Sequence, residues 1–374
     1  MTPRAWGLLF TAVVCVAACG GDSDGTAATG GMGGSGGSST SGGAAGAGGE
    51  AGGSGGFGAG PTITTEFGAP SYLATGLNYP LPLAVDAQHV YFAEYGSVVD
   101  EPDGLKRVAK NGGSPETIDM DQLVTDVAVD DSHVYWSGLV EIKRATKADM
   151  SAIEVLSNDE AEGVALGGEF LFYTYFDELH AVRKLDGVGT TIATGLGTDG
   201  VWGGRPVTAD SERVYVSFWD TSPPAGSYIS VVIDSWPHDG GSATRITEGV
   251  SDKMLPKSDG AFLYGIVNDV AYRVPVSGGQ REGLAPVSET ASDIAVDELN
   301  VYVVERGGVA GEYDCTGTTG RVVALPKNGG SVSVIADGLR CPRHLAVDAE
   351  GVYWTETGDW DVAGTGSVGA VSKL

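Results

Sequence analysis

The 374-residue chain has few basic residues and few histidines for its length. It contains 22 Lys and Arg against 49 Asp and Glu, so its formal charge is −27, and so acidic a protein repels nucleic acid. Catalytic signatures are missing as well, because the sequence contains no Gly-x-Ser-x-Gly elbow, no His-Glu-x-x-His and no Walker loop. We therefore exclude nucleic acid as a partner, and no reaction follows from the sequence.

The N-terminal segment has no apolar stretch long enough to span a bilayer. Arg4 precedes Ala5–Ala18, which is apolar over 14 residues, the length of a signal-peptide core. The stretch ends in Val-Ala-Ala-Cys at Cys19 and resembles a bacterial lipobox. We expect residues 1–18 to be a lipoprotein signal peptide and Cys19 to be lipidated, anchoring the protein in a bacterial membrane. The alternative is an ordinary signal peptide cut near Ala18, with Cys19 incidental.

Glycine is abundant but unevenly placed. Residues 20–60 include 20 of the 60 glycines, with Ala, Ser and Thr making up most of the rest. Such a segment buries too little surface to offset its ordering entropy, so residues 19–61 are predicted to form a flexible tether after the lipidated cysteine. Gly20, which follows Cys19, fits sorting to the outer membrane. The remaining residues, 62–374, carry a net charge of −25 and supply the folded part.

A sequence repeat predicts the architecture. An Asp ends an apolar run and is followed five positions later by an aromatic residue, as in Asp86 with Tyr91. Successive copies are separated by 44, 37, 43, 49, 38 and 51 residues, and the third copy has Gly167 in place of Asp. A period of 40 to 50 residues in a glycine-rich chain without helical periodicity indicates a β-propeller with one blade per repeat. The Asp is expected to accept backbone N–H groups in a turn.

The two ends of the folded part predict how the ring closes. The seventh repeat stops after its third strand, Ser367–Ser372, and lacks a fourth. Residues 62–75 resemble the fourth strand of the preceding repeat, because Ala74 and Ala336 each lie twelve positions before the next repeated Asp. We therefore expect an all-β, seven-bladed propeller whose last blade is completed by an N-terminal strand.

Cys315 and Cys341 are the two cysteines of the folded part. They lie in connections that reach the same face of a propeller, so in an exported protein they are predicted to form a disulfide. A metal site is the alternative, although no Cys-x-x-Cys spacing accompanies the pair.

That same face carries loops of unequal length, rich in aromatic and acidic residues. Such residues suit a glycan, a peptide or a protein ligand through stacking and hydrogen bonding. The alternative is that the loops of any acidic protein have this composition. The candidate ligand-binding residues are Trp202, Trp219, Asp220, Tyr313, Asp314, Asp359, Trp360 and Asp361.

Three polar residues occupy equivalent positions at the predicted channel mouth. Asp126, Asp293 and His344 each lie four residues before the position of the repeated Asp. Two carboxylates and an imidazole around one axis could hold a divalent cation such as calcium. The alternative is a chance occurrence of polar residues at this position.

The repeat resembles the YWTD and NHL-like β-propeller superfamily, most clearly at Ala346–Asp348 followed by Val352–Glu356. No repeat contains the full Tyr-Trp-Thr-Asp tetrad, because Glu356 replaces its Asp. The resemblance implies the fold, and the superfamily includes both binding modules and hydrolases or lyases with a metal in the channel. We expect a surface- or periplasm-exposed binding or scaffolding module; the alternative is a metal-dependent hydrolase or lyase acting at the channel mouth.

Overall fold

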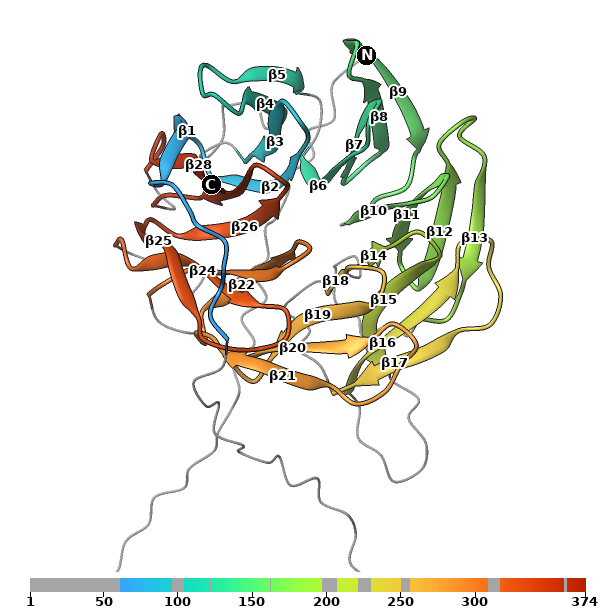
Figure 1. Cartoon of the computed structure of the whole chain (residues 1–374). Coiled ribbons are helices and arrows are strands. Elements are labelled where there is room, and N and C mark those ends of the chain that lie inside the picture. The colour runs from blue at the N-terminus through green and yellow to red at the C-terminus, as the bar shows by residue number, and fades with distance from the viewer. Residues whose placement is uncertain are drawn as a thin grey trace, which may run out of the picture. The chain divides into compact units, whose positions relative to one another are not determined.

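The computed structural model describes residues 61–95, 104–120, 123–161, 163–196, 207–220, 230–249, 256–308, 317–359 and 362–374. Over these ranges the chain forms no helix, and so none that could cross a membrane. It forms seven four-stranded antiparallel sheets, arranged as the blades of a propeller (Figure 1). The expected fold class and blade number are confirmed.

Each blade begins with its innermost strand and runs outward along the chain. The strands of blades 1 to 3 are β2 (Pro80–Val85), β3 (His89–Glu94), β4 (Gly104–Ala109) and β5 (Glu116–Asp119); β6 (Val124–Val129), β7 (His133–Gly138), β8 (Ile142–Thr146) and β9 (Asp149–Ser157); β10 (Val164–Gly167), β11 (Phe170–Tyr175), β12 (Glu178–Arg183) and β13 (Gly189–Ala193). Those of blades 4 and 5 are β14 (Val207–Ala209), β15 (Arg213–Asp220), β16 (Ser230–Pro237) and β17 (Thr244–Glu248); β18 (Lys257–Ser258), β19 (Phe262–Val267), β20 (Val270–Pro275) and β21 (Glu282–Pro286). Those of blades 6 and 7 are β22 (Ala291–Val296), β23 (Asn300–Glu305), β24 (Gly320–Pro326) and β25 (Ser333–Leu339); β26 (Pro342–Val347), β27 (Gly351–Glu356), β28 (Gly366–Ser372) and, from the other end of the folded part, β1 (Ser71–Leu77).

The inner strands form a closed ring. Each contacts the inner strand of the next blade, and the ring is completed where β26 of blade 7 contacts β2 of blade 1. Strand β1 pairs with β28 as the outermost strand of blade 7, with Ser71 opposite Ala370 and Leu77 opposite Gly366 (Figure 1). The closing strand is therefore present, but it extends over Ser71–Leu77 rather than over the predicted 62–75. Upstream of it, Phe67 forms an isolated bridge with Lys373.

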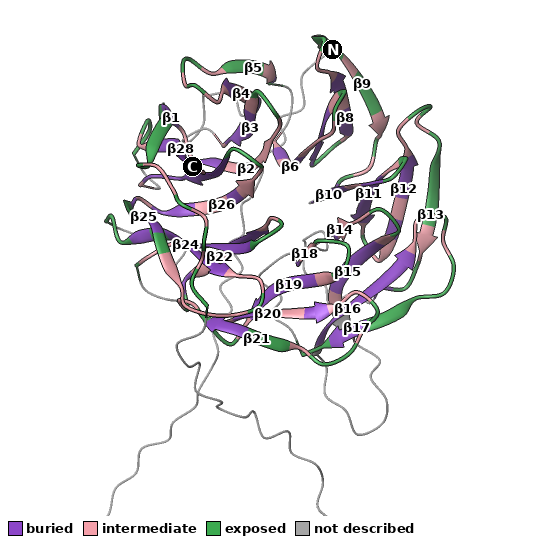
Figure 2. Ribbon diagram, viewed as in Figure 1, coloured by how far each residue is buried: buried purple, intermediate pink, exposed green. Residues whose placement is uncertain are grey.

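The core lies between neighbouring blades, because each blade packs its broad faces against the next. Second strands such as β3 and β7 are buried on both faces, which explains their near-continuous apolar sequences. Tyr91 of blade 1 and Trp136 of blade 2, for example, are both fully buried in one shared cluster. Outer strands such as β5 and β13 carry much of the exposed surface (Figure 2).

The repeated Asp organises the turn between the first and second strands. Asp86 accepts the N–H groups of Gln88 and His89, both at 2.8 Å, and the Tyr91 hydroxyl at 2.9 Å. Its counterparts in the other blades that retain the Asp make the same backbone bonds, as predicted. We call this end of the blades the turn face. The opposite end, where β3 ends at Glu94, is called the loop face.

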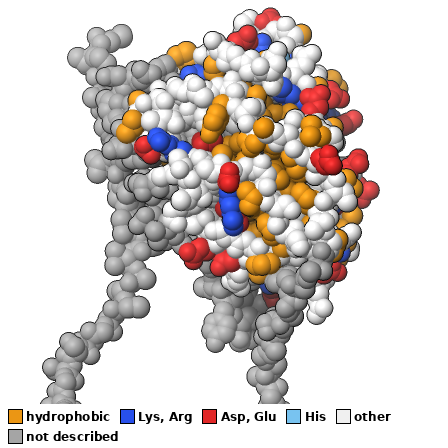
Figure 3. Space-filling model, turned by 60° about the vertical axis from the view of Figure 1, so that its left-hand side comes forward, with side chains coloured by type: hydrophobic (Ala, Val, Ile, Leu, Met, Phe, Trp, Pro, Cys, Tyr) orange, Lys and Arg blue, Asp and Glu red, His pale blue; other side chains and the backbone are white. Residues whose placement is uncertain are grey.

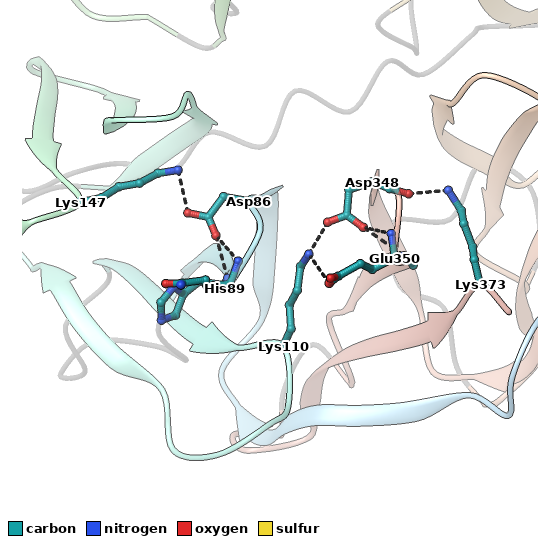
Figure 4. Close-up of polar contacts among 9 residues, drawn as sticks. Asp86, His89, Lys110, Lys147, Asp348, Glu350 and Lys373 are labelled. Atoms are coloured by element: carbon teal, nitrogen blue, oxygen red, sulfur yellow. Dashed lines mark hydrogen bonds and ion pairs between the residues drawn. The ribbon is translucent and has the colours of Figure 1, made fainter.

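A lysine from the next blade joins this turn, a feature that the sequence reasoning missed. Lys147 of blade 2 reaches Asp86 of blade 1 at 2.8 Å (Figure 4). Lys184 of blade 3 reaches Asp130 of blade 2 at 3.2 Å. The other such pairs are Lys327–Asp259, Lys373–Asp297 and Lys110–Asp348. In each case the lysine directly follows the third strand of its blade. These five ion pairs, the interblade latches, tie neighbouring blades together at the turn face.

The two blade junctions without a latch lack the lysine, and one of them lacks the Asp as well. Gly167 replaces the Asp of blade 3, and His238 takes the place of the lysine in blade 4. A Cβ on Gly167 would lie 2.8 Å from the His238 ring and 2.8 Å from the backbone oxygen of Asp210, so no larger residue fits there. At the other junction, Val276 occupies the lysine position, and Asp210 instead accepts the Ser258 hydroxyl at 3.0 Å.

Candidate functional site

The predicted ligand-binding residues fall mostly outside the described part of the chain. This holds for Trp202, Tyr313, Asp314, Trp360 and Asp361. Trp219 lies in β15, but its side chain is not described. Asp220 and Asp359 are therefore the members of this group whose surroundings can be stated.

Asp220 takes part in an ion-pair cluster at the loop-face end of blade 4. Its carboxylate pairs with the Arg245 guanidinium at 3.1 Å, and Arg245 also pairs with Asp234 on the neighbouring strand β16. The two carboxylates raise the pKa of Arg245, although burial opposes this. Asp220 thus helps to hold together strands β15, β16 and β17.

Asp126 and Asp293 lie on inner strands of opposite parts of the ring, and both are bonded to the next blade. Asp126 accepts the N–H of Val164 at 3.0 Å, and Asp293 accepts the N–H of Leu345 at 2.9 Å. Each also accepts the N–H of the residue that follows it. The two Asp residues therefore join consecutive inner strands.

The charges around these carboxylates differ. Burial raises the pKa of Asp126. Burial also acts on Asp293, but Lys257 and His344 outweigh it and lower the pKa of that carboxyl. The nearest imidazole nitrogen of His344 lies 3.6 Å from Asp293. Lys257 at the start of β18 was not singled out from the sequence, yet its charge acts on both carboxylates.

The predicted cation site is not assembled in this structure. Among the residues that are described, which include Asp126, Asp293 and His344, no group of three His, Cys, Asp or Glu side chains is placed to hold a metal ion. The physical reason is that each carboxylate is directed at a backbone N–H of the following blade. The equivalent positions of Asp126, Asp293 and His344 in the repeat predicted that they lie around one axis. They did not predict the direction of the side chains.

A cavity of about 300 Å³ opens on the loop-face side of the junction between blades 6 and 7. Its walls come from three places. Blade 7 supplies β1, the end of β27, and β28 with residues 364 and 365 before it. Gly338 and Arg340 lie where blade 6 leads into blade 7, and Thr318 lies before β24. The sequence reasoning missed this cavity, although it had named Asp359 close by. Arg340, in the wall, pairs with Asp359 at 2.9 Å.

Glu356 is the buried charge of this cavity, with only 2% of its surface exposed. One carboxylate oxygen accepts the backbone N–H of Arg340 at 2.6 Å, and the other accepts the Trp354 indole N–H at 3.1 Å. Tyr72 of the closing strand lies beside it. Burial, the charge of Glu356 and a hydrogen bond to its carboxylate raise the pKa of Tyr72. Glu356, which replaces the Asp of the Tyr-Trp-Thr-Asp pattern, thus lines the cavity.

Cys341 also lies at this junction. It is buried and adopts a positive φ of 52°, and its carbonyl accepts the Thr357 N–H at 3.1 Å. Cys315 lies outside the described residues, so the predicted bridge stays a prediction.

Comparison with known proteins supports the fold. The fold is that of a β-propeller. The chain is similar to the β-propeller domain of the Trilobed protease from Pyrococcus furiosus, with 10% identity and a TM-score of 0.56. The match covers 80% of this chain and 94% of that chain. That domain has an open velcro topology, whereas here β1 is paired into the last blade. The tricorn protease is similar with 12% identity and a TM-score of 0.50, over 77% of this chain and 33% of that chain.

A chain from the nidogen/laminin complex matches with 16% identity and a TM-score of 0.44, over 64% of this chain and 89% of that chain. No family model and no curated protein sequence matches the chain. At 10% and 12% identity, the likeness to the two proteases establishes the fold alone.

Proposed function

We propose that this protein is an exported lipoprotein whose propeller is a binding module, and that it takes its ligand on the loop face. The ligand is a glycan, a peptide or another protein. The proposal concerns recognition rather than catalysis, since the predicted metal ligands are directed at backbone groups.

The difference between the two faces carries this proposal. On the turn face, the acidic side chain of the repeated turn is engaged by backbone N–H groups and, in five blades, by a lysine from the next blade. Such paired groups stabilise the ring and have little capacity left for a ligand. On the loop face, connections of unequal length surround a polar cavity. A rigid scaffold with one variable face is the usual arrangement of a recognition module.

The surface charge also favours a module that binds a ligand other than a polyanion. Acidic side chains are spread over the visible side of the folded part, and several of the basic side chains lie beside them (Figure 3). Local pairing leaves a net negative field, which disfavours polyanions and admits neutral or cationic partners.

Lipidation of Cys19 would place this module at a membrane surface. The apolar segment Ala5–Ala18 and the small residues before Cys19 support it, and the glycine-rich residues 20–60 would give the module a reach of roughly 35 Å. Expressed in a bacterium, the wild-type protein should enter the detergent phase on phase separation. Cys19→Ser should leave it soluble or unprocessed, and unchanged partitioning would contradict lipidation.

Binding is tested by applying the full-length chain in detergent to arrays of neutral oligosaccharides and of peptides, followed by titration of the retained compounds. We expect saturable binding of at least one retained compound. Failure to retain any compound on either array would contradict the proposed function. The same sample should be assayed for metal, because one tightly bound divalent ion per chain would instead favour the hydrolase or lyase alternative.

A further inference from the structure

The cavity between blades 6 and 7 has a chemistry that narrows the ligand. We propose that it binds one hexose unit of a neutral glycan, with the Tyr72 ring as the stacking platform. This inference rests on the proposed function, because it assigns both a place and a ligand class to the binding module. The walls supply three arguments: their charges are paired internally, several of their hydroxyls are unused, and one aromatic ring is half exposed.

The charged groups of the cavity satisfy one another. Arg340 is paired with Asp359, and both oxygens of Glu356 accept protein N–H groups. An anionic ligand would have to compete with Asp359 for the guanidinium and would face the buried negative charge of Glu356. A cationic ligand would find both carboxylates already bonded. Displacing the bonds of Glu356 leaves a buried charge unpaired, which is costly, and the Arg340 guanidinium already has a carboxylate partner, so a neutral ligand fits best.

The groups that remain available are hydroxyls. Thr75, Thr318 and Ser367 line the cavity, and across the described part of the chain their hydroxyls make no hydrogen bond. Each hydroxyl can both donate and accept, which matches the groups of a sugar. The walls therefore offer a set of directional but uncharged contacts.

Tyr72 supplies an apolar surface next to these hydroxyls. Tyr72 lines the cavity, and 53% of its surface is exposed. A tyrosine ring is large and rigid with few rotatable bonds, so it presents a face at little entropic cost, and the C–H groups of a sugar ring can stack on it. The cavity volume of about 300 Å³ lies at the lower end of small-molecule sites, the scale of a single sugar unit.

The test compares variants of the full-length chain on an array of glucose-, galactose- and mannose-terminated neutral oligosaccharides, with titration of the strongest binder. Tyr72→Ala should weaken binding by about tenfold or more, since it removes the stacking surface. Thr318→Val keeps the shape of the wall but removes one hydroxyl, and should weaken binding about threefold to tenfold. Phe176→Ala is the matched control, because Phe176 is an exposed aromatic residue in blade 3, 67% exposed.

Tyr72 belongs to the closing strand, so each variant is first checked for an unchanged melting temperature. If Tyr72→Ala unfolds the protein, Thr318→Val decides the question. Neutral sugars that bind equally well to Thr318→Val and to the wild type would overturn the assignment of the cavity while leaving the binding function intact. Retention of cationic peptides but of no neutral sugar would overturn the ligand class. Retention of nothing would instead count against the proposed function.

Discussion

Lys110 in the first blade forms an ion pair with Asp348 in the last blade, joining residues 238 positions apart. The same ammonium lies 3.1 Å from Glu350 (Figure 4). The junction where the ring closes is thus held twice, by this latch at the turn face and by β1 in the outer part of blade 7.

Removing the closing latch should destabilise the folded state. Lys110→Met keeps the aliphatic stem but leaves the half-buried Asp348 carboxylate without its ammonium, so the free energy of unfolding should fall by about 1–2 kcal/mol. Urea unfolding of the full-length chain measures this. The control is Glu116→Gln, which breaks a pair with Arg107 whose acidic member is 67% exposed, and its effect on the free energy of unfolding should be clearly smaller. Equal effects would show that the latches do not hold the ring.

Acid should weaken the same latches. Burial opposes ionisation of Asp130, but the N–H groups of Ser132 and His133 and the Lys184 ammonium lower its pKa to about 2. The pKa values of the latch residues Asp86, Asp259 and Asp297 are also lowered. An unfolded Asp titrates near about 3.9, so this stabilisation is complete above that pH and is lost as the pH falls towards the folded-state values.

The free energy of unfolding should therefore decrease between pH 5 and pH 2.5. Asp130→Asn, which cannot titrate, should be less stable at pH 7 but should lose less over that range than the wild type. Denaturant unfolding at both pH values provides the comparison. A variant with the same pH slope as the wild type would refute the role of this carboxylate.

The closing strand should be essential to stability, unlike the glycine-rich segment. Deletion of residues 62–75 removes most of β1, including the buried Leu73, and should lower the melting temperature by about 5 °C or more. Deletion of residues 20–56 should leave it unchanged within about 1 °C. Calorimetry that gives one melting temperature for both deletions would contradict closure by this strand.

The Cys315–Cys341 bridge is tested by mass spectrometry of the non-reduced protein. A cross-linked peptide that contains both cysteines is expected, because Cys341 is buried at the junction of blades 6 and 7 and an exported protein meets an oxidising environment. Complete labelling of both thiols in folded, oxidised protein would show that the bridge is absent.

Much of the fold could be predicted because it depends on local, repeated chemistry. In five of the six turns that retain the Asp, it is hydrogen-bonded to the Tyr five positions later within one hairpin, so their spacing is visible in the sequence. The lysines of the latches carried a usable signal as well, since Lys110 and Lys327 each stand directly before Asn-Gly-Gly. That signal was missed because the bond is made to another blade.

The candidate site was harder to predict from the sequence, because it too depends on contacts between blades rather than within one hairpin. The cavity joins Tyr72, Thr318 and Glu356, which come from distant segments that only ring closure brings together. Asp126 and Asp293 were correctly placed as equivalent positions, but whether a carboxylate faces an ion or a neighbouring N–H depends on packing between blades.

The central claim is that recognition belongs to the loop face, and paired substitutions on the two faces test it most directly. Affinity is measured by titration with the neutral oligosaccharide that the wild-type chain retains best on the array. Trp219→Ala or Trp360→Ala should weaken binding by roughly thirtyfold, as expected for the loss of an aromatic anchor. His89→Ala and His133→Ala, in turns of the opposite face, should leave it unchanged. Loss of binding in the His variants together with normal binding in both Trp variants would contradict the account.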